Sequence, residues 1–202
     1  MSIVHTITVA VGERYTETIF FEPGFAGRTL TIHAGASADV RIFCEGIQCA
    51  GSIILLLYPA TGSTIIVGVS LTIAGTDQCT ITSMQMHVEP HATSHVCVRK
   101  IVSGAAHAIY KGIIHIAPEA QSCVVSQDDK TMLDGALARA ESMPALEVLA
   151  HEVTCSHGSA VGHSDPAILF YLASRGLAPE DARTLWYAAF LDEARYAVLK
   201  TE

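Results

Sequence analysis

Residues that form turns recur at regular intervals through the first 126 residues of the chain. The intervals are roughly 11 to 15 residues long, and the segments between the turns are rich in β-branched and apolar residues. The turn signals are Pro23–Gly24, Gly35, Gly46, Gly62, Gly75, Pro90, Gly104 and Pro118. A strand and a turn repeated at a nearly constant period predict an all-β repeat architecture.

Apolar and polar residues alternate within several of these segments. Val40 and Ile42 alternate with charged neighbours, and in the segment 84–88 two methionines and a valine alternate with Gln85 and His87. Successive side chains of a strand point to opposite faces. We therefore expect one face of each strand in a core, carrying the apolar residues, and the other face in water.

Two architectures fit this pattern: a Greek-key β-sandwich, and a flattened parallel β-helix in which each half-coil is one strand and one turn. Antiparallel neighbours favour two-residue Asn-Gly or Asp-Gly turns, and neither pair occurs before residue 134. We therefore predict a mainly β fold, a right-handed parallel β-helix in which segments near Val40, Val67 and Val96 stack on one another. Residues 51–73 are apolar on both strand faces, so their outer face needs cover from helices, another subunit or the same chain.

The pattern changes after residue 126. Residues 128–141 are polar and carry mixed signals, whereas residues 144–156 resume a strand pattern. The β-structure is therefore expected to continue up to the segment "VTCSHGSAVG" at residues 153–162. We expect a β-helix core over residues 1–163 and a helical hairpin over residues 164–202.

Helix signals define that hairpin. Asp165 and Pro166 suit an N-cap and a first helical position, and Gly176 suits a helix end. A second helix is expected to begin at Pro179, with acidic residues in its first turn. Its buried stripe is expected to contain Ala182, Leu185, Trp186, Ala189 and Phe190.

Composition limits the partners and the compartment. The net charge is −8, and no Lys or Arg lies between Arg41 and Arg99, whereas a nucleic-acid partner needs a basic stripe. The apolar runs fall short of the ~20 residues that a membrane helix needs, and the N-terminus lacks the features of a secretory signal. We expect a cytoplasmic protein that binds neither nucleic acid nor membrane, with its six scattered cysteines present as thiols.

The segment 153–162 carries the most distinctive chemistry. In an extended strand, Cys155 and His157 point to the same face, where a thiolate and an imidazole can bind one metal. Two ligands do not close a four-coordinate site, so further ligands must come from another strand or subunit. The alternative is a buried cysteine beside a histidine that hydrogen-bonds across a turn. A Cys-His nucleophile is disfavoured because no catalytic signature surrounds it.

Other histidines and other enzyme classes give weaker signals. His87, His91 and His95 have helical metal-site spacing, but Pro90 breaks a helix there, so we interpret them as separate strand and turn residues. The cupin metal pattern is absent. A metal-binding or carbohydrate-active β-helix or β-sandwich enzyme is the alternative function, although residues 42–98 contain only three acidic groups and no basic one.

Four pieces of sequence resemble the C-terminal core of the SufB/SufD family, the scaffold proteins of the SUF iron–sulfur cluster assembly system. They occur in the family's order within residues 142–194: "PALEV", "CSHGSAVG", "DPAILFYLASRGL" and the "AF" at residues 189–190. The resemblance implies a parallel β-helix. It also implies that His157, beside Cys155, takes part in forming the nascent cluster at the contact with a SufB partner.

The departures from the family pattern indicate the SufD branch. SufB proteins carry acidic residues where this chain has Ser156 and Gly158, and a cysteine where an ungapped count gives Asp129. The chain is about half the usual length of the family and is expected to lack its N-terminal helical region.

The resemblance further implies a non-enzymatic scaffold that handles an iron–sulfur cluster transiently, in complex. Its partners would be a SufC-type ABC ATPase and either a SufB-like subunit or a second copy of the chain as a homodimer. The ATPase would dock on the C-terminal hairpin, where Tyr187, Leu191 and Arg195 are expected to be exposed, away from the buried stripe. The chain has no phosphate-binding loop of its own.

Overall fold

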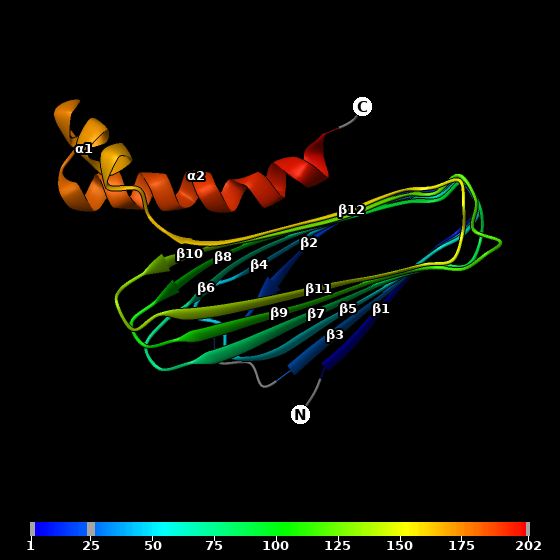
Figure 1. Ribbon diagram of the computed structural model, residues 1–202, viewed down its shortest axis with the longest axis horizontal. Helices are drawn as coiled ribbons and strands as arrows, with labels where there is room; N and C mark the ends of the chain where they lie inside the picture. The colour runs from blue at the N-terminus through cyan, green and yellow to red at the C-terminus, as the bar shows by residue number, and fades with distance from the viewer. Residues whose placement is uncertain (1–2, 24–26, 201–202) are drawn as a thin grey trace.

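A computed structural model describes residues 3–23 and 27–200 of the chain. Its strands form two six-stranded parallel sheets that face each other (Figure 1). Sheet A contains β1 (Ile3–Val9), β3 (Gly27–Ala34), β5 (Gly51–Pro59), β7 (Gln78–His87), β9 (His107–Ile116) and β11 (Arg139–Val148). Sheet B contains β2 (Arg14–Phe21), β4 (Asp39–Gly46), β6 (Thr64–Ile73), β8 (Thr93–Ser103), β10 (Val124–Asp134) and β12 (Thr154–His163).

The chain enters the two sheets alternately, so each coil contributes one strand to each sheet. All neighbouring strands of the described residues are parallel. Val67 lies beside Val96, and Val40 lies beside Ile65, two residues before Val67. The predicted parallel β-helix is therefore confirmed, and the Greek-key sandwich, which needs antiparallel neighbours, is excluded.

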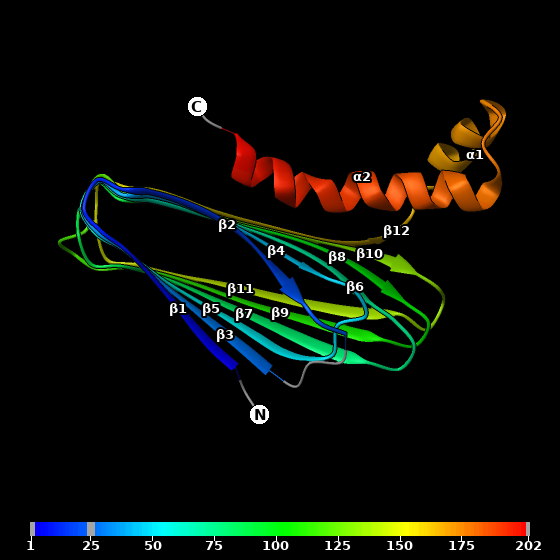
Figure 2. The ribbon, with the colours of Figure 1, turned by 180° about the vertical axis from the view of Figure 1, so that it is seen from behind.

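The strands lengthen along the β-helix. β1 has 7 residues and β2, β3 and β4 have 8 each. In the last three coils, β7, β9, β11 and β12 have 10 residues, and β8 and β10 have 11. The β-helix is therefore wider at its C-terminal end than at its N-terminal end, which Figure 2 shows from behind.

The core lies between the two sheets. Val40 and Ile42 are fully buried there, as expected. The expected orientation of β7 is wrong, because Gln85 and His87 are fully buried whereas Met84 and Met86, which alternate with them, are half-buried on the outer face. Ile81 occupies a core position, and strand periodicity then places every second residue after it on the core side, whatever its polarity.

Hydrogen bonds satisfy most of the polar groups that β7 buries. Ser94 Oγ, on β8, donates to Gln85 Oε1 at 2.6 Å and lies 2.7 Å from His87 Nε2. A buried polar group that is hydrogen-bonded avoids most of its desolvation penalty. His91 lies in the turn after β7, and His95 lies on the outer face of β8, so the three histidines are separate residues, as expected.

The turn signals lie at or just after the ends of strands, apart from Gly24, which is outside the described residues. Gly62, Gly75 and Gly104 share a φ of 69°, a conformation that glycine adopts without the strain other residues meet. Residues 128–141, unassigned from sequence, lie mostly in β10 and β11. Residues 144–156 do not form one strand, because a turn separates β11 from β12.

Two helices follow the β-helix, α1 (Pro166–Ser174) and α2 (Pro179–Leu199), and α2 lies along the outer face of sheet B (Figure 1). The Asp165 carboxylate accepts a hydrogen bond from the Ala167 N–H at 2.8 Å, and Gly176 has a φ of 92°. The predicted start and end of the first helix, and the start of the second at Pro179, are therefore confirmed.

The expected buried stripe of α2 is wrong in part. Ala182 is buried, and Trp186 and Phe190 are half-buried, but Leu185 and Ala189 are exposed. The reason is a close contact farther along the helix. A Cβ on Gly68 of β6 would lie 2.2 Å from the Ala194 carbonyl oxygen, so glycine at this position lets the backbone of α2 approach the sheet and bury Ala194 and Val198.

The helix α2 thus supplies part of the cover expected for residues 51–73. It packs on the outer face of β6, where Ser70 Oγ donates to the Leu191 carbonyl at 2.7 Å. The outer face of β5, with half-buried Leu56 and exposed Tyr58, is covered by neither helix. No helix in the described chain combines the length and apolar character needed to cross a bilayer.

Candidate functional site

The segment that contains Cys155 and His157 forms β12, the terminal strand of sheet B. Cys155 is in register with Val125 and His157 with Gln127, both buried residues of β10. Cys155 and His157 therefore share the face of β12 that points toward the interior of the β-helix. Within the described ranges no further coil covers this strand, so His157 is exposed and Cys155 is half-buried.

The Cys155 side chain packs against a small apolar cluster at this end of the core, which includes Ile114, Cys123 and Val125. Burial raises the pKa of the Cys155 thiol, so it is protonated at neutral pH. Among the described residues, no group of three or more His, Cys, Asp or Glu side chains could hold a metal ion. The structure thus brings Cys155 and His157 to one face but adds no third ligand from this chain.

An interior polar cluster, consisting of Ser83, Lys100, Tyr110, Gln127 and Asp129, lies directly behind β12. All five side chains are almost completely buried. Lys100 Nζ forms an ion pair with Asp129 Oδ1 and lies 5.0 Å from the centroid of the Tyr110 ring. The Ser83 and Tyr110 hydroxyl oxygens are 2.8 Å apart. Desolvation lowers the pKa of Lys100, although Asp129 opposes that shift.

Two atoms of the interior polar cluster have no hydrogen-bond partner among the described residues, Gln127 Nε2 and Asp129 Oδ2. Gln127 is accommodated because Gly112 faces it: a Cβ at Gly112 would lie 2.3 Å from Gln127 Oε1. Buried polar atoms are rarely left unpaired, and a buried ion pair gives little net stability. Because Gln127 and Asp129 pair with His157 and Ser159 of β12, the cluster forms a polar floor behind the candidate site.

Sequence reasoning missed this polar floor. One pattern in the sequence could have indicated it: Gln127, Asp129 and Thr131 occupy alternate positions and therefore share one face of β10. That signal could not identify Lys100, which lies 29 residues before Asp129 and meets it only through the stacking of adjacent coils.

Of the three positions expected to be exposed on α2, Arg195 is exposed, whereas Tyr187 and Leu191 face sheet B. Tyr187 is half-buried, and burial together with a hydrogen bond to Asp134 raises its pKa to about 12. Leu191 is half-buried. Arg195 pairs with Glu45 at 3.0 Å. The expectation of exposure away from the buried stripe is therefore wrong for Tyr187 and Leu191, because the Gly68 contact sets which side of α2 meets the sheet.

The exposed apolar side chains of the hairpin lie elsewhere. Near the α1–α2 turn they are Phe170 and Tyr171 of α1 and Leu185 of α2, with 76%, 55% and 50% of their surfaces exposed, and at the far end of α2 they are Tyr196 and Leu199. Helix α1 contributes no buried residue and packs against α2. The hairpin thus presents an uncovered apolar surface.

Comparison with known proteins identifies the family. The family described as "SUF system FeS cluster assembly, SufBD core domain" matches residues 57–190, from the end of β5 into α2. The chain belongs to the SufBD family. SufBD membership supports a role in iron–sulfur cluster assembly.

Curated SufBD relatives are similar to the chain over about half of its length. The iron–sulfur cluster assembly protein SufD of Escherichia coli is 34% identical over 112 residues, which cover 55% of this chain and 26% of the relative. A SufBD family protein of Synechocystis is 33% identical over 104 residues, which cover 52% of this chain and 23% of the relative. SufD of Bacillus subtilis is 28% identical over 110 residues, which cover 54% of this chain and 25% of the relative. The chain is SufD-like, and its matched part spans about a quarter of these relatives.

Proposed function

We propose that the chain is a non-enzymatic, SufD-like scaffold subunit that assembles iron–sulfur clusters in the cytoplasm. The observation that carries the proposal is the placement of Cys155 and His157 side by side on the uncovered terminal strand of a SufBD core. A cysteine sulfur, which loses its proton when it binds iron, and an imidazole are suitable ligands for an iron–sulfur cluster. The cluster is the cargo of this site and is held transiently.

The site is completed by a partner. A cluster needs about four ligands, and Cys155 and His157 supply two. β12 pairs with β10 on one side and leaves its other edge unpaired within the described chain, and an open strand edge is a template for pairing with another chain. Pairing near residues 144–160, across a two-fold axis with a second copy or beside a SufB-like subunit, brings two ligand sets together.

The C-terminal hairpin, residues 164–202, is the proposed docking region for a SufC-type ABC ATPase, separate from the β-helix core at residues 1–163. Tyr187 and Leu191 face sheet B, so their proposed contribution is to hold α2 in position. Arg195, whose side chain is 45% exposed, is the position among the three that can contact the ATPase directly.

Anaerobic reconstitution with iron and sulfide tests the proposal. We expect the chain alone to hold a cluster poorly and the complex with a SufB-like protein to form one, as measured by visible absorption. His157→Ala is expected to impair cluster formation in the complex at a stability cost of about 1 kcal/mol. His163→Ala is the matched control, because His163 is an exposed histidine at the other end of the same strand.

Two outcomes would lead us to abandon this assignment. One is a stable cluster on the isolated monomer, and the other is normal cluster assembly by the His157→Ala complex. Sedimentation of the same samples tests the interface separately. A monomer at micromolar concentration that does not shift on addition of the SufB-like protein contradicts pairing through β12.

A further inference from the structure

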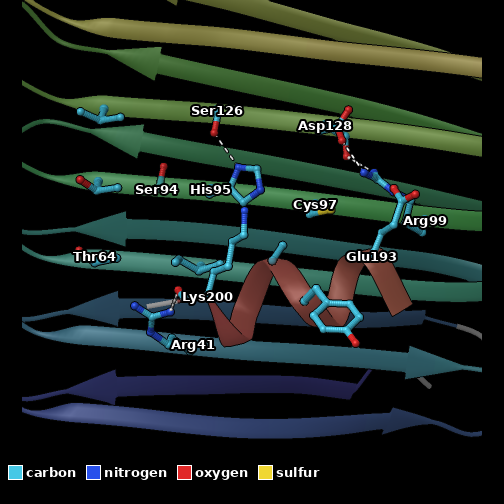
Figure 3. A pocket seen from close by; sticks show the side chains of 15 residues that line it. Arg41, Thr64, Ser94, His95, Cys97, Arg99, Ser126, Asp128, Glu193 and Lys200 are labelled. Atoms are coloured by element: carbon cyan, nitrogen blue, oxygen red, sulfur yellow. Dashed lines mark hydrogen bonds and ion pairs between the residues drawn. The ribbon is translucent and has the colours of Figure 1, made fainter. Parts of the chain in front are cut away.

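A groove of about 750 Å³ lies between the C-terminal half of α2 and the outer face of sheet B (Figure 3). Its floor is formed by outward-facing residues of β6, β8 and β10, and its wall by one side of α2. The volume falls within the range of small-molecule sites. The groove is distinct from the candidate cluster site, because Ser126 on its floor and Gln127 behind His157 are successive residues of β10 and point to opposite faces.

The middle of the floor carries hydrogen-bonding groups. His95 lies beside Ser126, with its Nδ1 atom 2.6 Å from the Ser126 hydroxyl oxygen (Figure 3). Desolvation lowers the pKa of His95, so its imidazole is neutral at neutral pH. His95 Nε2 makes no hydrogen bond within residues 3–23 and 27–200. The Thr64 and Thr93 side chains line the same floor.

Charges are distributed unevenly along the groove. At one end, Asp128 and Glu193 are both bound by Arg99, at 2.5 and 2.7 Å. At the other end lie Arg41 and Lys200. The ammonium group of Lys200 forms no ion pair in the part of the chain that the structure describes. Lys130 also pairs with these two carboxylates, so two cations balance two acidic groups at the Arg99 end. The Arg41–Lys200 end is therefore the one that favours an anion.

Arg41 is held in place at that end. Its Nε atom pairs with Asp39 at 2.9 Å, and its Nη1 atom donates to the carbonyls of Val198 and Lys200 at the end of α2. These bonds offset the negative end of the helix dipole, so they remove an obstacle to anion binding. An anchored guanidinium that keeps a donor available is preorganised for a phosphate.

The wall and part of the floor are apolar. Ile66 and Val124 lie on the floor, and Ala197 and Tyr196 lie on the wall. Tyr196 is 67% exposed, so its ring is available to a ligand. A flat ring can pack between such apolar side chains and an aromatic ring.

We propose that this groove binds a phosphate monoester that carries a planar ring, a ligand of the size of a mononucleotide. The phosphate lies at Arg41 and Lys200, and the ring packs against Tyr196 over the apolar part of the floor. His95 Nε2 and the threonine hydroxyls bind the polar groups between them. This binding site goes beyond the proposed scaffold role and does not depend on it.

Calorimetric titration of the full chain with AMP tests this site, with adenosine and inorganic phosphate as partial ligands. We expect saturable binding of AMP that is tighter than that of either partial ligand and weakens as salt rises. Lys200→Met should raise the Kd for AMP by roughly fivefold, the value of one exposed charge pair. The control is Lys111→Met, which removes the same charge from the outer face of sheet A and should leave the Kd unchanged.

The proposal is overturned if AMP shows no saturable binding at millimolar concentration, or if adenosine binds as tightly as AMP. It is equally overturned if Lys200→Met and Lys111→Met have the same effect. None of these results bears on cluster assembly at Cys155 and His157, so the two proposals fail independently.

Discussion

Replacing Lys100 with methionine removes the positive charge from the ion pair with Asp129 inside the β-helix. Both side chains are fully buried, and Asp129 Oδ2 already lacks a partner among the described residues. The variant therefore leaves a carboxylate with no cation in the core, and it also removes the contact with the Tyr110 ring. Breaking a buried ion pair from one side costs about 3–5 kcal/mol, a large fraction of the ~5–15 kcal/mol typical of a folded domain.

The double variant Lys100→Met/Asp129→Val separates the loss of the pair from the stranding of one charge. Replacing both partners of a buried ion pair by apolar residues of similar size is often neutral or stabilising. We therefore expect the double variant to regain most of the stability that the single variant loses. The remaining loss reflects the altered packing around Tyr110.

Urea unfolding measures both effects. For an m-value of about 2 kcal/mol/M, the single variant should shift the midpoint down by roughly 2 M. Far-UV circular dichroism follows the β-helix, while the fluorescence of Trp186, the one tryptophan of the chain, reports on α2. A loss below about 1 kcal/mol for Lys100→Met, or a double variant no more stable than the single one, would refute our view of the pair.

Two further predictions concern α2 and the buried histidine. Gly68→Ala places a Cβ against the Ala194 backbone, so we expect α2 to detach from sheet B. Limited proteolysis should then cleave the hairpin of the variant earlier than that of the unmodified chain, and equal cleavage rates in the two proteins would contradict the close contact. Burial lowers the pKa of His87 from 6.5 to about 4. Its contribution to stability should therefore be full above pH 6.5, fall by up to about 3 kcal/mol as the pH drops from 6.5 to 4, and level off below 4. His87→Gln should reduce the loss of stability at acid pH, measured by acid unfolding, whereas the control variant His163→Gln at an exposed position should not. If both variants lose stability equally at acid pH, groups other than His87 cause the loss.

Local signals accounted for much of the fold. The turn residues gave the coil repeat, because prolines and glycines, among them Gly62, Gly75 and Gly104 with positive φ, favour turns through their own backbone preferences. Asp165 and Gly176 delimited the first helix for the same reason, since caps depend on neighbours a few residues away. The family pieces in residues 142–194 likewise needed no knowledge of tertiary contacts.

The features that sequence reasoning missed depend on contacts between coils. Polarity suggested that Gln85 and His87 face water, but the register set by Ile81 turns them inward, where Ser94 satisfies them. The buried side of α2 was misplaced because Gly68 receives the helix from a different coil. Lys100 and Asp129 meet for the same reason, and no local pattern joins residues that far apart.

The change in coil width limits how copies of the β-helix can join. Its first strands have 7 or 8 residues and its last have 10 or 11, so the narrow end of one molecule does not match the wide end of another. Stacking of unlike ends would leave several backbone groups of the longer strands unpaired at each junction, and such head-to-tail contacts are the ones that grow into open filaments. Two wide ends match in length, and so do two narrow ends. Within the described residues, the widening of the coils therefore disfavours head-to-tail stacking, a form of protection against aggregation that is built into the strand lengths themselves.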